Sequence, residues 1–188
     1  MISIIIPTFN NLDYLKLAIE SIKKNSKLPN EIILHINEGT DGTLDFVKKN
    51  NYKFSYSEVN DGICVGCNKA ASISKYNLIL YAHDDMYFCP NWDQFLIDEV
   101  NRLDTKLFYL SGTMINGDPK LNGHLNFYAG ENVKTFDELK LLNNYKNLTC
   151  NDFQGSTWAP HLIHKEVWNK IGGFSVEFSP GTGSDPDL

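Results

Sequence analysis

The stretch that decides the fold is NLILYAHDDMYFCP, residues 77–90. Its first part, 77–82, is mostly apolar and has the length of a buried strand, and the polarity then rises abruptly at His83, Asp84 and Asp85. Open α/β sheets bind ligands outside the carboxyl ends of their strands, where two adjacent carboxylates can hold a divalent cation against phosphate oxygens. An extended backbone would place His83 and Asp85 on one side and Asp84 on the other. The alternative is a polar loop whose Asp residues cap the next helix.

Strand-like and helix-like segments alternate on both sides of this stretch, over residues 1–112. Apolar, β-branched runs predict further strands at 2–6, 31–36, 54–59 and 107–112. Apolar residues predict helices at about 12–22, 44–47 and 91–100, and the small and polar residues of 64–74 suit a closely packed helix. The turn-forming cluster PTFNN, residues 7–11, is expected to end the first strand. This alternation is typical of an α/β fold with a mostly parallel central sheet flanked by helices.

The rest of the chain has a different composition. Residues 113–149 are richer in Asn, Gly and Lys, which predicts a looser region that covers the site, with a short helix at 136–142 inside it. Strand-like character returns at 153–162, and a helix is expected over 164–171, ended by Gly172 and Gly173. No repeat or linker separates these segments, so we expect a single domain over 1–188, made of a larger part, 1–112, and a smaller part, 113–188.

The composition and charge argue against several classes of protein. The formal net charge of −6 argues against a nucleic-acid partner, because such binding draws on clustered Lys and Arg. No apolar run approaches the roughly 20 residues of a membrane span, so at most peripheral membrane contact is expected. The first residues lack the basic region of a signal peptide, which favours a cytoplasmic location. CVGC, residues 64–67, has no second pair to complete a zinc site, so free thiols are expected.

Four motifs occur in one order along the chain: IIIPTFN at 4–10, EII with NEGTDGT at 31–43, HDD at 83–85 ahead of Pro90, and IGGF at 171–174 ahead of SDPDL at 184–188. With NDG at 60–62 and the later Asn68, they resemble the family-two inverting glycosyltransferases, which use nucleotide sugars and have the GT-A fold. Each motif alone is weak, and the order and spacing carry the resemblance. It implies a Rossmann-like nucleotide-sugar-binding part over 1–112 and a smaller acceptor-side part over 113–188.

The resemblance also implies residue roles. Pro7 and Thr8 would lie along the nucleotide base, Asn37 and Glu38 would touch base or ribose, and Asp84 would lie near the ribose. The full nucleotide-sugar site would comprise Pro7, Thr8, Asn10, Asn37, Glu38, Asn68, His83 and Asp84. The loop at Asn37 departs from the commoner Asp-Asp-Gly-Ser form, so the identity of the base stays open. Thr8 and Asn10 as caps of the first helix, and 37–43 as a plain turn, are the alternatives.

The chemical step is assigned in the same way. Asp85 matches the acid that binds a divalent metal, Mn²⁺ or Mg²⁺, and His83 stands where many members have an acid. Asp185 matches the general base, a role that a carboxylate beside an acceptor hydroxyl can perform. Asp187 is an alternative on the same segment, and Trp158 is a candidate to stack on an acceptor sugar. The chain ends three residues after Asp185, where the family normally continues, so a fragment and a short member are both compatible with it.

Two histidines toward the end of the chain are candidate metal ligands. His161 and His164 would share one face of a helix, either as metal ligands or as packed residues. We expect a metal-assisted, inverting transferase that passes a sugar from a nucleoside-diphosphate donor to a glycan, lipid-linked or small acceptor. A catalytically silent nucleotide- or glycan-binding module is one alternative. A nucleotidyltransferase is another, although residues 7–11 lack the Gly-rich, basic loop it would need, and no G-x-G-x-x-G of a dinucleotide oxidoreductase follows the first strand.

Overall fold

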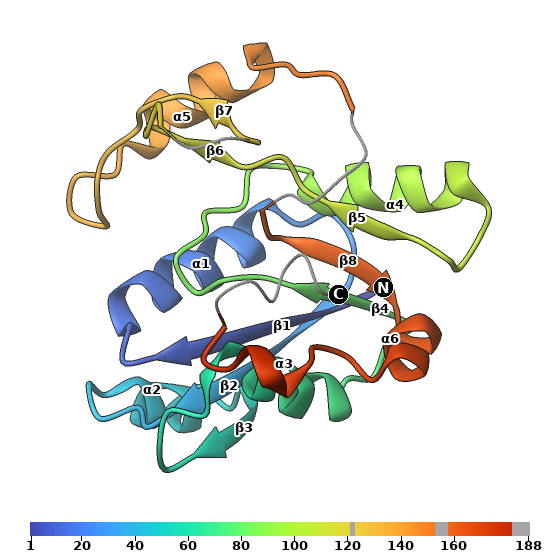
Figure 1. The fold of residues 1–188 in the computed structure, drawn as a ribbon. Helices are drawn as coiled ribbons and strands as arrows, with labels where there is room; N and C mark the ends of the chain where they lie inside the picture. Colours follow the sequence, from blue (N-terminus) through green and yellow to red (C-terminus); the bar gives the residue numbers. More distant parts are fainter. Residues whose placement is uncertain (121–122, 153–157, 182–188) are drawn as a thin grey trace.

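The computed structural model describes residues 1–120, 123–152 and 158–181 of the protein (Figure 1). Its central sheet has six strands in the order β3 (Lys53–Ser57), β2 (Asn30–Asn37), β1 (Ile2–Phe9), β4 (Leu78–Tyr81), β8 (His161–His164) and β5 (Tyr109–Ser111). Strands β3, β2, β1 and β4 are parallel, and β8 runs antiparallel to both β4 and β5. The predicted mostly parallel α/β sheet is therefore confirmed.

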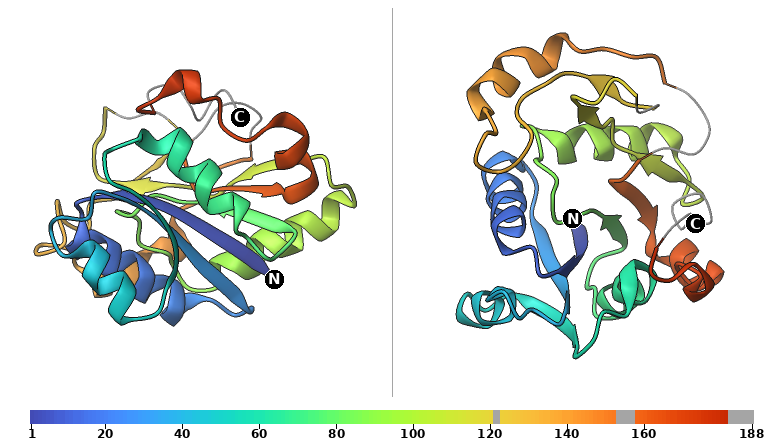
Figure 2. Two further views of the ribbon diagram at one scale, coloured as in Figure 1. Left: turned by 90° about the horizontal axis from the view of Figure 1, so that it is seen from below. Right: turned by 60° about the vertical axis from the view of Figure 1, so that its left-hand side comes forward.

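Helices cover both faces of the sheet. They are α1 (Leu12–Asn25), α2 (Thr43–Lys49), α3 (Gly62–Ser72), α4 (Trp92–Leu103) and α6 (Lys165–Ile171). Ile4 and Ile6 of β1 belong to one buried cluster with side chains of α1, α2 and α4, while Ile5 belongs to a second cluster with α3 and α6. This division follows from the strand period of two, which sends alternate side chains to opposite faces. Figure 2 shows α3 and α6 on one side of the sheet and α1, α2 and α4 on the other.

Strand β1 is longer than the sequence predicted. It continues through Pro7 to Phe9, and these last residues pair with β2, so the expected end of the strand at residue 7 was wrong. Ile5 O accepts a hydrogen bond from Ala82 N, at 3.1 Å, where β4 ends. Pro7, two residues further, turns its backbone to the same side, beyond β4. The N–H that proline lacks is therefore not needed there, and among the described residues no strand pairs with the carboxyl end of β1 on the β4 side.

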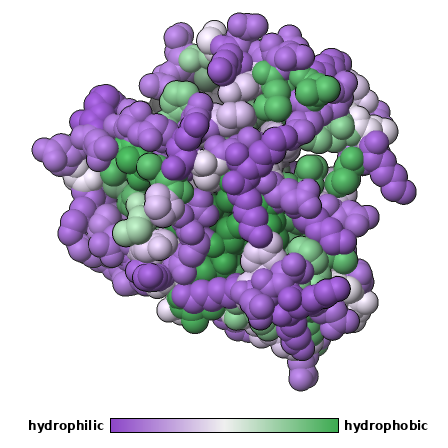
Figure 3. Space-filling view, turned by 180° about the vertical axis from the view of Figure 1, so that it is seen from behind, coloured by the Kyte–Doolittle hydropathy of each residue, from purple (hydrophilic) through white to green (hydrophobic). Residues whose placement is uncertain are grey.

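A smaller outer part lies beyond α1 and α4. It contains a parallel pair, β6 (Ile115–Asn116) and β7 (Leu125–Asn126), the helix α5 (Glu138–Asn144) and a single 3₁₀ turn, η1 (Tyr145–Asn147). Helix α5 is the predicted short helix, shifted by two residues. Among the described residues between 113 and 152, Leu141 alone is buried. From behind, the surface is mostly hydrophilic, and its largest hydrophobic group lies in a hollow near the middle of that face (Figure 3).

The two histidines lie on a strand, so the prediction that they share a helical face was wrong. Three residues apart on β8, His161 and His164 face opposite sides of the sheet. His161 is buried, with its ring stacked on Tyr109 at a centroid distance of 4.7 Å. His164 Nδ1 accepts a hydrogen bond from Glu166 N, at 3.2 Å, and caps α6. Both are thus packed residues, the other alternative considered for them.

The end of the described chain contacts the start of α3. After α6 and the 3₁₀ turn η2 (Val176–Phe178), Pro180 O accepts a hydrogen bond from Ile63 N, at 2.8 Å. Gly62 makes this contact possible, because its φ is +84° and a Cβ there would lie 2.6 Å from Pro180 Cα. Within the described ranges, no helix has the length and apolar character needed to cross a bilayer.

Candidate functional site

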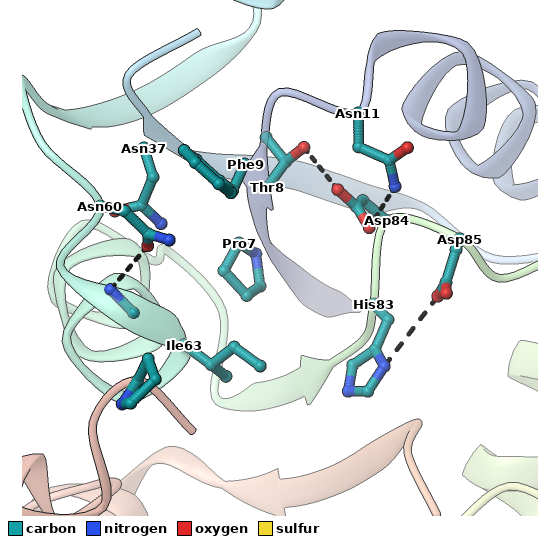
Figure 4. Close-up of a pocket in the computed structure, with 12 residues that line it drawn as sticks. Pro7, Thr8, Phe9, Asn11, Asn37, Asn60, Ile63, His83, Asp84 and Asp85 are labelled. Atoms are coloured by element: carbon teal, nitrogen blue, oxygen red, sulfur yellow. Dashed lines mark hydrogen bonds and ion pairs between the residues drawn. The ribbon is translucent and has the colours of Figure 1, made fainter. Parts of the chain in front are cut away.

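A pocket of about 310 Å³ opens at the carboxyl ends of β1, β2 and β4 (Figure 4). It lies where the strand order reverses, because the chain runs outward from β1 to β2 and β3 and then returns to β4 on the other side. Open α/β sheets bind ligands at such a point. The described residues that line the pocket are Pro7, Thr8, Phe9, Asn11, Asn37, Asn60, Gly62, Ile63, His83, Asp84, Asp85 and Pro180.

Asp84 is held by the end of β1. Thr8 Oγ1 donates to Asp84 Oδ2 at 2.5 Å, and Asn11 Nδ2 donates to Asp84 Oδ1 at 3.0 Å. Burial raises the pKa of Asp84 above its ordinary value, and the hydrogen bonds from Thr8 and Asn11 partly offset that rise. Both carboxylate oxygens are thus occupied by the protein, and Asp84 fixes the turn after β4 to the end of β1.

Asp85 is directed away from Asp84 and toward His83 (Figure 4). Its carboxylate Oδ1 lies 4.0 Å from His83 Nδ1, and its side chain is 57% exposed. His83 Nε2 lies 2.7 Å from the hydroxyl of the buried Tyr81, which fixes the imidazole. Asp84 and Asp85 are in a turn beyond β4 and not in an extended strand, so the reason given for separating the two acids was wrong although they do diverge. They do not cap α4 either, because that helix begins only at Trp92.

The donor groups at this site can be tested against a divalent cation. Across the parts of the chain that the structure describes, no three His, Cys, Asp or Glu side chains come together as a ready-made metal site. A cation bound to phosphates usually takes one or two carboxylates from the protein and its other ligands from phosphate and water. Asp85 fits that limited role, since its carboxylate is exposed at the pocket, whereas both Asp84 oxygens have protein donors.

Three of the predicted nucleotide-sugar residues do not line this pocket. Asn10 and Glu38 bond to each other, from Asn10 Nδ2 to Glu38 Oε2 at 3.3 Å, and Asn10 Oδ1 accepts from Thr40 N at 2.8 Å. Asn68 uses both ends of its amide on the backbone of Phe174, at 2.8 and 3.0 Å. Asn10 and Glu38 join two loops, Asn68 joins α3 to the segment after α6, and none of the three lines the pocket. Neither Thr8 nor Asn10 caps α1 through its side chain, which was the alternative for them.

The remaining predictions concern the acceptor side. Trp158 is 38% exposed, lies next to Gly123 and is not among the residues that line the pocket. Asp185 and Asp187 lie outside the described residues, so their roles stay predictions. No residue of the described outer part, 113–152, lines the pocket, whereas we had expected residues 113–149 to cover it.

The sequence analysis missed several residues that line the pocket. Phe9 and Asn11 were assigned to a turn, and the hydrogen bond from Asn11 to Asp84 becomes visible only when β1 and β4 are paired. Ile63 and Pro180 supply apolar wall at the start of α3. The signal that was available is the NDG motif before Ile63, which already marked this loop.

The class of protein follows from the sheet, the reversal of strand order and the acids after β4: this is a GT-A fold. Two solved structures are similar to it. One is S. aureus TarS 1-349 in complex with UDP, with a TM-score of 0.67 and 19% identity, covering 96% of this chain and 52% of that chain. The other is the mannosyltransferase PcManGT from Pyrobaculum calidifontis in complex with GDP-Man and Mn²⁺, with a TM-score of 0.64 and 16% identity, covering 98% and 49%.

The family is shown by sequence. The profile of Glycosyl transferase family 2 matches residues 3–162, and the chain belongs to this family. It is also 26% identical to the uncharacterized protein y4gI of Sinorhizobium fredii (strain NBRC 101917 / NGR234) over 215 residues, covering 100% of this chain and 22% of that protein. The chain thus spans about half the length of the similar structures and about a fifth of this relative.

Proposed function

We propose that this protein transfers a sugar from a nucleoside-diphosphate donor to an acceptor, with inversion and with the help of a divalent metal. The observation that carries the proposal is the pocket at the ends of β1, β2 and β4, with Asp84 and Asp85 at one end, in a member of Glycosyl transferase family 2. The structures of TarS with UDP and with UDP-GlcNAc, and of PcManGT with GDP-Man and Mn²⁺, support a donor of this class.

The pocket has two chemically different ends, which suit the two ends of such a donor (Figure 4). Pro7, Asn37 and Ile63 form a mainly apolar end that suits a flat base, as small-molecule sites combine apolar walls with a few polar groups. His83 and Asp85 form the polar end, where a diphosphate with its cation would lie. Asp84, held by Thr8 and Asn11, keeps the two ends at a fixed separation.

Metal and base would share the chemical step. A divalent cation, Mn²⁺ or Mg²⁺, would offset charge that develops on the departing diphosphate. Asp85 would hold that cation, and His83 beside it would keep the carboxylate oriented. For the base we retain Asp185, on the strength of the family resemblance: it would accept the proton of the acceptor hydroxyl, a contribution typically of about 10²- to 10⁴-fold.

Calorimetric titration with UDP and GDP, with and without Mn²⁺, tests the donor half of the proposal. Wild-type protein should bind at least one of them more tightly with Mn²⁺, and Asp85→Asn should lose the metal-dependent gain. The matched control is Asp98→Asn, an exposed carboxyl on α4 outside the pocket, which should leave both titrations unchanged. Failure of every nucleoside diphosphate to bind, in either condition, would refute the donor assignment.

Binding and transfer measurements on a second variant distinguish the role of the metal ligand from that of the base. Asp185→Asn should bind donor and metal almost normally and transfer sugar about 10²- to 10⁴-fold more slowly. Asp187→Asn is its control on the same segment. Loss of transfer in Asp187→Asn, with Asp185→Asn still active, would move the base to Asp187.

The acceptor, a glycan, a lipid-linked sugar or a small molecule, is proposed to meet the donor from the Trp158 side. Trp158 keeps 38% of its surface exposed, as a stacking platform for a sugar face requires. Trp158→Ala should therefore weaken acceptor use more than nucleotide binding. Equal loss of both, together with a lower melting temperature, would show that Trp158 is a structural residue.

A silent nucleotide- or glycan-binding module is the second candidate, favoured by His83 where relatives have an acid and by the single exposed carboxylate beside it. Hydrolysis of the donor in the absence of acceptor separates the two functions. Release of free sugar that Asp85→Ala abolishes would support the transferase. Tight nucleotide binding with no turnover across several acceptors would support the module.

A further inference from the structure

Asn37 is the last residue of β2 and the polar group at the apolar end of the pocket. Its side chain is 3% exposed, so its amide has little freedom to rotate. The oxygen of a side-chain amide can only accept hydrogen bonds, and its nitrogen can only donate them. Whether the oxygen or the nitrogen points into the pocket therefore decides which ligands the pocket can bind.

The backbone of Asp61 fixes the orientation of this amide. Asp61 N lies 2.9 Å from Asn37 Oδ1, and a backbone N–H can only donate. Rotating the amide by half a turn would set its own N–H₂ against this N–H. Oδ1 is thus committed to the wall behind the pocket, and Nδ2 is left on the pocket side, as Figure 4 shows.

A buried histidine agrees with this direction. His35 Nε2 lies 3.3 Å from the same Asn37 Oδ1 and 3.3 Å from Ser57 Oγ, whose own proton goes to Asp61, so this nitrogen carries a proton. His35 Nδ1 is then free to accept from the hydroxyl of Ser55, at 2.8 Å. Burial, and after it the nearby ammonium of Lys69, lower the pKa of His35, which keeps the ring neutral. Gly66 of α3 leaves room for the ring, because a Cβ there would lie 2.6 Å from it.

Side-chain hydrogen bonds also hold the residues next to His35 in place. Lys69 Nζ donates to Asp61 Oδ2 at 2.5 Å and to Ser57 Oγ at 2.7 Å, and Ser57 Oγ donates to the same carboxylate at 2.6 Å. These bonds hold the loop at Asp61, and with it the N–H that orients Asn37. In the described ranges, no protein group accepts a hydrogen bond from Asn37 Nδ2.

We propose that Asn37 selects the donor nucleotide by offering two N–H groups to its base, so that the base must present a hydrogen-bond acceptor at this point. The inference rests on the proposed function and adds the chemistry of the base edge to it. His35 and Asp61 act as positioning residues, because they hold the amide of Asn37 and do not themselves line the pocket. A base that places an N–H opposite Asn37 leaves two donors facing each other, which costs affinity.

Asn37→Asp inverts this preference with almost no change of shape. One carboxylate oxygen would still accept from Asp61 N and His35 Nε2, and the other would face the pocket as an acceptor. UDP and CDP are the matched probes, because uracil and cytosine exchange acceptor and donor at positions 3 and 4, and GDP and ADP are a second such pair. The ratio of the two dissociation constants within a pair should shift by about tenfold or more, which corresponds to about 1.4 kcal/mol.

The ratio also removes the main complication of the variant. A new negative charge weakens binding of every diphosphate, but equally for both members of a pair. Asn101→Asp, an exposed residue of α4, adds the same charge outside the pocket and should leave the ratio unchanged. If Asn37→Asp does not fold, Asn37→Ser removes the pocket-facing amide and should bring the ratio close to one. A ratio that stays within twofold of wild type in these variants would overturn the inference, provided that nucleotide binds.

The tautomer of His35 gives a test that needs no nucleotide. Long-range ¹H–¹⁵N correlation spectra of the imidazole distinguish a proton on Nε2 from one on Nδ1. The Nε2–H form supports the assignment, and the Nδ1–H form overturns it even if UDP binds. The proposed function and the orientation of Asn37 can therefore fail separately.

Discussion

The carboxyl ends of β1, β2 and β4 and the outer part, residues 113–152, differ in how their side chains are held. The first region rests on strands that are almost wholly buried, and its polar groups bond to one another, as Thr8 does to Asp84. The described outer part has one buried residue, Leu141. Its contacts with the rest of the molecule include Glu138, which accepts from Lys24 at 2.8 Å and from Tyr87 at 2.6 Å, and Phe136, whose ring lies against Tyr87.

This difference suits the two regions to different tasks, one to positioning a ligand and the other to covering it. A site built on buried strands keeps its geometry before any ligand arrives, because the core opposes movement of the side chains. A segment with few buried contacts opens at a lower free energy than the core does. The strand ends are therefore suited to orient a donor, and the outer part is suited to move around a larger second substrate.

The sharpest test compares a leucine and an isoleucine of the two regions. Ile5→Ala removes a side chain with no exposed surface from β1 and should lower the free energy of unfolding by about 2–5 kcal/mol. Leu139→Ala on α5 removes a side chain that is 71% exposed and should change it by less than about 0.5 kcal/mol. Urea titrations followed by tryptophan fluorescence measure both. Similar losses in the two variants would show that the two regions do not differ in how strongly their side chains are held.

Acid should destabilise the sheet. Burial, with a further contribution from His83, lowers the pKa of His161 to about 4, against 6.5 for an ordinary histidine. Between these values the unfolded chain binds a proton that the folded protein excludes, so the free energy of unfolding should fall as the pH drops from 6.5 to 4, by up to about 3 kcal/mol. His161→Phe keeps the stacking and should flatten this slope, leaving the part due to His35, whose pKa is also lowered. Parallel slopes for wild type and variant would show that His161 is not responsible.

A pair of threonines tests the polar contacts of each region. Thr8→Val removes a donor from Asp84 and should cost about 1–2 kcal/mol at pH 7. The cost should be smaller at pH 4, because the lost bond stabilises the ionised carboxylate and the raised pKa of Asp84 brings protonation into that range. Thr135→Val, in the outer part, removes an exposed acceptor for Glu131 N and should cost less than about 0.5 kcal/mol. Unfolding curves at both pH values give the loss in unfolding free energy for each variant. Equal losses for the two variants at pH 7 would show that the polar contacts of the two regions contribute equally.

The smallest expected effect on stability comes from the ion pair that joins the outer part to α1. Lys24→Ala breaks an exposed ion pair with Glu138, a kind of contact worth about 0.2–1 kcal/mol. Hydrogen exchange should become faster at the amides of α5 and stay unchanged in β1 and β2. Faster exchange in the strands as well would mean that the outer part and the sheet open together.

Sequence patterns predicted the sheet well because its strands are short apolar runs, as residues 77–82 illustrate. They failed where a pairing partner decides the outcome. Pro7 looked like the end of a strand, and only the early end of β4 allows the strand to pass through it. His161 and His164 looked like a helical pair because the antiparallel partner that makes them a strand is 80 residues away in sequence.

The candidate site was predicted to a similar extent. Pro7, Thr8, Asn37, His83, Asp84 and Asp85 line one pocket, as the order of the motifs had indicated. Asn10, Glu38 and Asn68 do not, since their partners lie in other loops that no local pattern reveals. The orientation of Asn37 could not be predicted at all, because it depends on the backbone N–H of Asp61, which is 24 residues away.

The unequal lengths of β1 and β4 have one more consequence. Four residues of β1, Pro7 among them, extend past the point where β4 stops, so the recess exists as a step in the backbone before any side chain is added. The side chains around that step can be exchanged without altering the hydrogen-bond ladder that creates it. The recess and the chemistry of its lining thereby depend on different atoms, so a side chain that changes the preferred substrate leaves the backbone step in place.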